Sequence, residues 1–156
     1  LENSACTDFN IGVAGYPEKH MEAASLEQDI YHLKKKVEAG ADYIVTQMFF
    51  DNQKYYDFVE KCRTSGINVP IIPGLKPITT KSQLSMIPHR FKVDLPNELV
   101  IAIAKAKDNK EVKEIGINWC IQQSKDLMKN GAPVLHYYSM GKSEVVKRIA
   151  SEVFKD

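Results

Sequence analysis

Four short, mostly apolar runs, separated by segments with helical spacing, are the feature that most restricts the fold of this chain. The runs cover residues 10–16, 43–49, 69–72 and 134–138. They are nearly continuous in their apolar character, which is typical of strands buried on both faces of a parallel sheet. Because an amphipathic segment follows each run, the sequence predicts four βα units.

Two helices are predicted from their ends as well as from their spacing. Ser25 and Gln28 match the S-x-x-Q capping box, and Gly40 ends the apolar pattern that follows. The second helix is expected to begin at Asp51 or Asn52 and to stop before Gly66. Each of these helices would connect one strand to the next.

The connection after the third strand is unusually long. Pro73 and Gly74 predict a sharp exit turn. A short helix is expected over residues 80–87, another opening near Pro96, and a longer one over 110–129. A last helix is predicted over 143–154. No flexible linker is visible, so residues 1–156 are interpreted as one domain or part of one.

Parallel βα units form either an open doubly wound sheet or a closed barrel, and the pattern alone does not choose between them. A complete (β/α)8 barrel needs about 250 residues, so a chain of 156 residues would supply about half of one. The chain starts without methionine and reaches its first strand almost at once. We therefore expect a longer parent chain.

Composition excludes several classes of protein. The net charge of +1 gives no electrostatic reason to expect nucleic acid or a membrane surface as partner. No apolar stretch approaches the roughly 20 residues that span a bilayer, and no signal peptide is recognisable. The three cysteines, Cys6, Cys62 and Cys120, show no metal-ligand spacing. Reduced thiols and a cytoplasmic location are expected.

Polar side chains at the carboxyl ends of the strands are the candidates for a site, because ligands bind there in both architectures. Gln47 stands in an apolar run, where its amide either bonds to neighbouring backbone or grips a heteroaromatic ligand. His20 is either a loop histidine or a ligand contact. Lys76 precedes Pro77 in a turn; a solvated lysine is the default, and a Schiff-base lysine is the alternative.

A polar stripe follows the first predicted helix. Asp29, His32 and Lys36 recur at helical spacing, with Lys35 beside them. This stripe is either a solvated face or a set of groups for a diphosphate and a ribose hydroxyl. The sequence contains neither GxGxxG nor GxxxxGK[ST]. Any phosphate would therefore be held by side chains.

Five segments together resemble the methylenetetrahydrofolate reductase family. They are VAGYPEKH at 13–20, KVEAGA at 36–41, TQMFFD at 46–51, IIPGLKP at 71–77 and LHYYSM at 135–140. They occur in the family's order and span nearly the whole chain. The resemblance implies a (β/α)8 TIM barrel with FAD at the carboxyl ends of the strands, of which this chain would supply about the last four βα units.

The resemblance also implies roles for individual residues. Gln47 falls on a family position that contacts nicotinamide and pterin in turn, and Gln83 and Lys142 fall on positions that contact folate. Lys35 and Lys142 stand where some members carry arginine, and Ile87 stands where some carry an aromatic residue. The positions expected to hold FAD are Tyr16, His20, Ala23, Asp29, His32, Lys35 and Lys36.

The implied activity is reduction of 5,10-methylenetetrahydrofolate to 5-methyltetrahydrofolate with NAD(P)H, which feeds methionine synthesis. The family's general acid belongs to the half that precedes this segment, so no catalytic residue is assigned and the isolated chain is expected to be inactive. A non-catalytic half-barrel that binds a partner is the alternative. A half-barrel exposes two sheet edges and an apolar interior, so we expect it to pair with the N-terminal half or with another copy of itself as a homo-oligomer.

Overall fold

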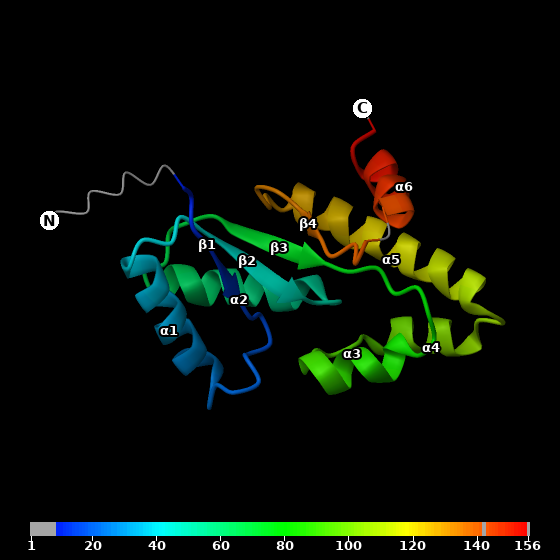
Figure 1. Ribbon diagram of the computed structural model, residues 1–156, viewed down its shortest axis with the longest axis horizontal. Coiled ribbons are helices and arrows are strands. Elements are labelled where there is room, and N and C mark those ends of the chain that lie inside the picture. Colours follow the sequence, from blue (N-terminus) through cyan, green and yellow to red (C-terminus); the bar gives the residue numbers. More distant parts are fainter. Residues whose placement is uncertain (1–8, 142, 156) are drawn as a thin grey trace, which may run out of the picture.

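The computed structural model describes residues 9–141 and 143–155 and contains four strands and six helices in that part of the chain (Figure 1). The elements, in chain order, are β1 Gly12–Gly15, α1 Leu26–Glu38, β2 Tyr43–Met48, α2 Asn52–Thr64, β3 Ile71–Leu75, α3 Gln83–Phe91, α4 Asn97–Lys105, α5 Asn109–Lys129, β4 His136–Tyr137 and α6 Ser143–Val153. All four predicted strands and all six predicted helices are present.

The order of the strands settles the choice that the sequence left open. The strands lie in the order β1-β2-β3-β4, and each pairs in parallel with the next. A doubly wound sheet reverses its strand order at a switch point, whereas a barrel adds each new strand on the same side of the last one. The chain therefore has the arrangement of four consecutive units of a (β/α)8 barrel.

The two faces of the sheet differ in burial. Along β2, Ile44, Thr46 and Met48 are buried, and Ile44 packs in one cluster with side chains of α1, α2, α5 and α6. The alternate residues face the other side, where Ala14, Val45 and Ile72 lie in one row across three strands. Ala14 is exposed, and Val45 and Ile72 are half-buried. The face that would line a barrel is thus left partly uncovered.

The helix starts follow the predicted chemistry. Ser25 Oγ accepts a hydrogen bond from Gln28 N–H at 3.2 Å, and Gln28 Oε1 accepts from Ala24 N–H at 3.1 Å. Asp51, one of the two predicted caps of α2, accepts from Gln53 N–H at 2.9 Å. These side chains satisfy N–H groups that have no partner inside the first turn of a helix.

Three predicted boundaries differ from those of the structure. β3 runs through Pro73 and Gly74, which were expected to form its exit turn. α3 begins at Gln83, since the Gln83 side chain accepts bonds from the N–H groups of Thr79 and Thr80, and it continues past Pro88 to Phe91. β4 is only two residues long.

α5 crosses the molecule and connects its two hydrophobic clusters. Ile117 and Cys120 belong to the cluster beneath the sheet, and Val112 belongs to the second cluster around α3 and α4. Cys62 and Cys120 are buried free thiols, and burial raises the pKa of each to about 12. A reduced state stays the expectation for both thiols; Cys6 lies outside the described residues.

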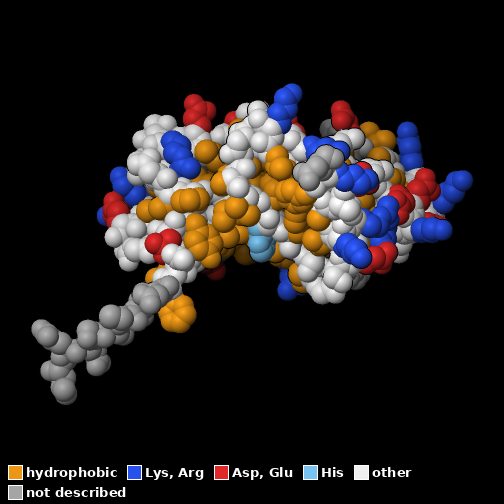
Figure 2. All heavy atoms as spheres, turned by 90° about the horizontal axis from the view of Figure 1, so that it is seen from above, with side chains coloured by type: hydrophobic (Ala, Val, Ile, Leu, Met, Phe, Trp, Pro, Cys, Tyr) orange, Lys and Arg blue, Asp and Glu red, His pale blue; other side chains and the backbone are white. Residues whose placement is uncertain are grey.

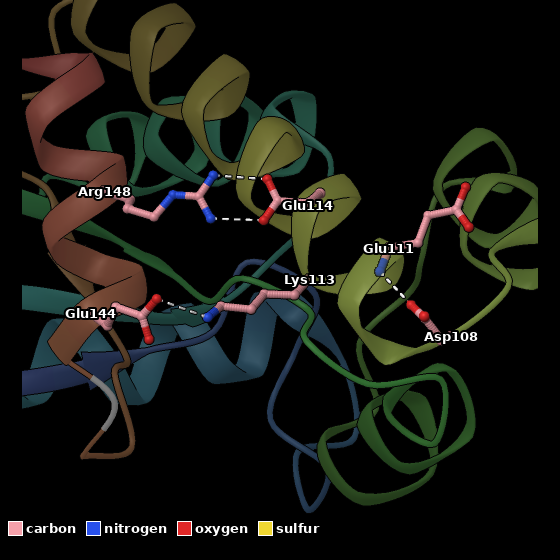
Figure 3. Close-up of polar contacts among 6 residues, drawn as sticks. All are labelled: Asp108, Glu111, Lys113, Glu114, Glu144 and Arg148. Carbon is pink, nitrogen blue, oxygen red and sulfur yellow. Dashed lines mark hydrogen bonds and ion pairs between the residues drawn. The ribbon is translucent and has the colours of Figure 1, made fainter.

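Ion pairs join α5 to α6 at the surface (Figure 3). Arg148 on α6 donates two parallel hydrogen bonds to Glu114 on α5, at 2.7 and 2.8 Å. Lys113 and Glu144 pair at 3.2 Å, and the Asp108 side chain accepts from Glu111 N–H at the start of α5. Because the two ion pairs between α5 and α6 are in contact with solvent, each is expected to contribute little to stability.

Gly116 on α5 generates a testable prediction. A Cβ at this position would lie 1.8 Å from the carbonyl oxygen of Ile78, and backbone cannot swing aside. We expect Gly116→Ala to lower the free energy of unfolding by about 3 kcal/mol, measured by urea denaturation. Gly12→Ala is the control, because its Cβ would meet the half-buried Tyr43 ring, a side chain able to move. Equal losses in the two variants would contradict the assigned contact.

Candidate functional site

A β-bulge in β2 places Gln47 at the end of the sheet. Val45 lies opposite Ile72 and Met48 opposite Gly74, so two residues of β2 face the single residue Pro73. Proline offers no N–H to the ladder. Gly74 N–H instead donates to Thr46 Oγ1 at 2.9 Å. Bulges of this kind redirect a side chain, and here the redirected side chain is Gln47.

The bulge is held by Gly74 of β3 and by Tyr138, the residue after β4. A Cβ on Gly74 would lie 2.2 Å from the Thr46 carbonyl oxygen, so only glycine permits this approach. The same oxygen accepts a hydrogen bond from the Tyr138 hydroxyl at 2.8 Å. β2, β3 and the residue after β4 therefore meet at one point.

A cavity of 540 Å³ opens beside this point, at the carboxyl ends of the strands. Gln47 and Gln83 both line it, although 36 positions separate them in the sequence. Its remaining wall comes from the segment after β3, from α3, from the segment after β4 and from α6. The cavity thus lies at the strand ends, where the sequence predicts a site.

Both glutamines turn their oxygens toward the protein. Gln47 Oε1 accepts from Met48 N–H at 3.0 Å. Gln83 Oε1 accepts from Thr79 N–H at 2.6 Å and from Thr80 N–H at 3.1 Å. Since the oxygens are engaged, the two amide nitrogens remain as donors toward a ligand. The two readings offered for Gln47 are therefore compatible: its oxygen bonds to backbone while its nitrogen stays available.

The loop between β1 and α1 brings together four of the residues expected to contact FAD. The rings of Tyr16 and His20 meet edge to face with centroids 4.5 Å apart. His20 N–H donates to Asp29 Oδ2 at 2.7 Å, and Ala23 N–H donates to the His20 carbonyl at 3.0 Å. Burial, then the charge of Asp29, raises the pKa of Tyr16. The loop is thus held in one shape by its own contacts.

The other residues expected at FAD lie on the exposed side of α1. Lys35 pairs with Glu38 at 3.0 Å and lies 5.6 Å from the centre of the Tyr31 ring. The His32 ring also meets Tyr31, and Lys36 is exposed. The structure therefore does not bring these three into contact with the loop residues. A ligand would have to reach along α1 to touch both groups.

Glu18 is the residue of this region that the sequence reasoning passed over. Its side chain is 10% exposed, lies 3.9 Å from Lys54 Nζ, and accepts a hydrogen bond from Asp94 N–H at 3.2 Å. Loss of hydration outweighs these attractions and raises the pKa of Glu18 to about 7. Glu18 thus joins the β1–α1 loop to the segment that follows α3.

Some expected site features lie elsewhere. Lys142 is outside the described residues. Ile87 is fully buried in the second hydrophobic cluster and does not line the cavity, whereas Arg90 and Phe91 of the same helix do. Within residues 9–141 and 143–155, no cluster of acidic, histidine or cysteine side chains is suited to a metal ion. In the same part of the chain, no helix is long and apolar enough to cross a bilayer.

The parallel sheet and its helices define the fold as about half of a βα barrel, with a cavity at the carboxyl ends of the strands. A family model described as methylenetetrahydrofolate reductase matches residues 1–153. The chain belongs to the methylenetetrahydrofolate reductase family, as its motifs suggested.

Curated relatives support this assignment. Methylenetetrahydrofolate reductase 1 of Schizosaccharomyces pombe is 38% identical, over 91% of this chain and 24% of the relative. The 5,10-methylenetetrahydrofolate reductase of Salmonella typhimurium is 34% identical, over 88% of this chain and 47% of the relative. The chain therefore spans about half of the bacterial relative and about a quarter of the yeast one.

A solved structure shares the fold. It is an uncharacterized protein from Clostridium thermocellum that binds two copies of 5-methyl-5,6,7,8-tetrahydrofolic acid, with a TM-score of 0.64 and 20% sequence identity. The match covers 93% of this chain and 52% of that one. At this identity the likeness supports the fold alone.

The buried carboxyl of Glu18 predicts a pH dependence. Between the ordinary pKa of an unfolded glutamate, 4.5, and the folded value of about 7, the folded chain holds a proton that the unfolded chain has released. The free energy of unfolding should therefore fall as pH rises through this window and level off above it. Solvent screening reduces the expected loss to about 1 kcal/mol.

Glu18→Gln removes this titration. Chemical denaturation at pH 5 and pH 8 should show a smaller decline for Glu18→Gln than for the wild type. Glu98→Gln, at an exposed position on α4, is the control and should keep the wild-type decline. A wild-type decline no larger than that of Glu18→Gln would show that this carboxyl is hydrated in the folded chain.

Proposed function

We propose that this chain is the C-terminal half of a FAD-binding barrel, and that the complete barrel reduces 5,10-methylenetetrahydrofolate to 5-methyltetrahydrofolate with NAD(P)H. The observation that carries this proposal is the meeting of Gln47 and Gln83 at one cavity, in a chain that belongs to the reductase family. The product would feed methionine synthesis in the cytoplasm.

The β1–α1 loop and α1 are proposed to hold the FAD. Tyr16, His20 and Ala23 would contact it from the loop. Asp29 would contact it from α1, where its carboxylate also accepts a hydrogen bond from His20 N–H. His32, Lys35 and Lys36 supply a histidine and two cations on the exposed side of α1, which suits a diphosphate without a glycine-rich loop. A flavin held there would supply the hydride-transfer chemistry that links nicotinamide oxidation to folate reduction.

The cavity is proposed to hold nicotinamide and folate in turn. The amide nitrogens of Gln47 and Gln83 would donate hydrogen bonds to ring or carbonyl acceptors, and the apolar part of the wall suits a flat heteroaromatic ring. Lys142, expected at the folate, would contact the same ligand. Relatives named for NADH in Arabidopsis thaliana and for NADPH in Caenorhabditis elegans support a nicotinamide co-substrate of either kind.

The general acid and much of the flavin ring pocket are proposed to come from the half that this chain lacks. No residue of this chain is assigned the role of proton donor. The isolated chain is therefore expected to show no reductase activity. A non-catalytic binding module remains the alternative, and reconstitution separates the two.

Mixing the chain with a matching N-terminal half should restore a yellow colour and NAD(P)H oxidation that depends on folate. In that assembly, Gln47→Ala should lower kcat/KM for the folate about tenfold, because a hydrogen bond to the ligand is lost, while flavin absorbance stays unchanged. Gln122→Ala, at an exposed position on α5, is the control. A well-folded assembly without colour or activity would favour the binding module.

The uncovered face of the sheet is proposed to receive the N-terminal half, or another copy of this chain in a homo-oligomer. Ala14, Val45 and Ile72 form an apolar row on that face. Figure 2, which shows the molecule from above, has hydrophobic side chains across the middle of that view and many charged groups toward its ends. Among the described residues, β1 and β4 are the edge strands of the sheet, and another strand would satisfy their outer backbone groups.

We expect the isolated chain to self-associate in analytical sedimentation. Ile72→Lys should shift it toward monomer, because a charge on the apolar row opposes burial. Ile101→Lys is the control; Ile101 is 52% exposed on α4, away from the row. Thermal unfolding would verify that both variants are folded. A wild-type chain that sediments as a clean monomer would contradict the proposed role of this face.

A further inference from the structure

Arg90 differs from the other two arginines in how its guanidinium is used. Arg63 donates to the carbonyls of Ile67 and Val69, and Arg148 forms its paired bonds with Glu114. Within the part of the chain that the structure describes, Arg90 makes no ion pair or hydrogen bond; its guanidinium lies 5.8 Å from the centre of the Phe91 ring. A planar group with five donors is left at the rim of the cavity.

The charge of the cavity wall indicates the class of ligand. Among the described residues that line it, Arg90 and Lys76 are cations, and none is a carboxylate. The amide nitrogens of Gln47 and Gln83 add further donors. A wall rich in donors and cations, with a net charge near zero elsewhere in the chain, favours an anion with hydrogen-bond acceptors.

Phe91 supplies an aromatic surface beside this cation. Ile87, one turn earlier on α3, is fully buried against the second cluster and offers the cavity no surface. Phe91 is half-buried and lines the cavity, because α3 continues past Pro88 and ends only at Lys92, whose φ of 55° is left-handed. The end of α3 thus presents a ring and a guanidinium side by side.

We propose that Arg90 binds the carboxylate of an aminobenzoyl-glutamate tail, and that Phe91 forms the apolar wall against its benzoyl ring. This inference rests on the proposed function, since that function makes folate the substrate. It assigns tail recognition to this end of α3. Guanidinium suits a carboxylate because it donates two parallel hydrogen bonds.

The test uses fragments of the tail and the full chain. 4-Aminobenzoyl-L-glutamate and its uncharged diamide are titrated separately into the labelled protein, and binding is followed by NMR chemical shifts. The wild type should bind the acid about tenfold more tightly than the diamide, and added salt should reduce the difference. Arg90→Ala should abolish the preference, and Arg90→Lys should keep part of it.

Two further variants separate the roles. Phe91→Leu should weaken acid and diamide alike, because it removes aromatic surface and no charge. His89→Ala is the matched control: His89 is exposed on the same turn but does not line the cavity, so the wild-type preference should persist. Spectra of the free proteins verify the fold of each variant. Equal binding of acid and diamide by the wild type, no binding of either, or a preference that survives in Arg90→Ala would overturn the proposal.

Failure of this inference is distinguishable from failure of the proposed function. The titration contains no flavin, nicotinamide or pterin, and its readout is independent of turnover. Tail binding without flavin recovery in the reconstituted barrel would reject the reductase function and leave the anion site standing. Flavin recovery without a preference for the acid would support the reductase function and reject the proposed carboxylate site.

Discussion

The close approach of Gly74 to the Thr46 carbonyl is the contact on which the architecture of the site depends. It lets Thr46 Oγ1 accept from Gly74 N–H in a ladder that Pro73 interrupts, and it leaves the Thr46 carbonyl to the Tyr138 hydroxyl. Three neighbouring strand segments are fixed together at the edge where the cavity opens. A side chain at position 74 would push β3 away from β2 and release the constraint that directs Gln47.

How far the sequence predicts the molecule depends on whether the cause is local. Ser25, Gln28 and Asp51 cap helices through residues two to four positions away, so their helices were predicted correctly. Pro73 and Gly74 carry a local preference for turns, yet pairing with β2 holds them in a strand. The bulge requires contacts among three segments that are distant in sequence, so the pattern of apolar residues along the chain does not predict it.

The candidate site shows the same division. The resemblance named Gln47 and Gln83, but only the fold shows that both line one cavity and that their oxygens are engaged. Arg90 and Phe91 were missed because the predicted helix ended at Ile87, before Pro88. Ile87 and Phe91 are four residues apart, so a prediction that continued this helix for one more turn would have placed both large apolar side chains on neighbouring parts of its surface. Proline in a helix was the misleading signal.

The distribution of charge connects these features. The chain is almost neutral overall, so attraction for an anion depends on local arrangements: cations line the cavity and the exposed side of α1, and one carboxylate, that of Glu18, is buried. Glu18 lies on the loop that follows β1 and bonds to the segment that follows α3. It therefore ties together the two regions to which cofactor and substrate are assigned. Burying that carboxyl opposes folding near neutral pH, because the charged form loses its hydration. The same burial allows the hydrogen bond from Asp94 N–H that connects the two regions.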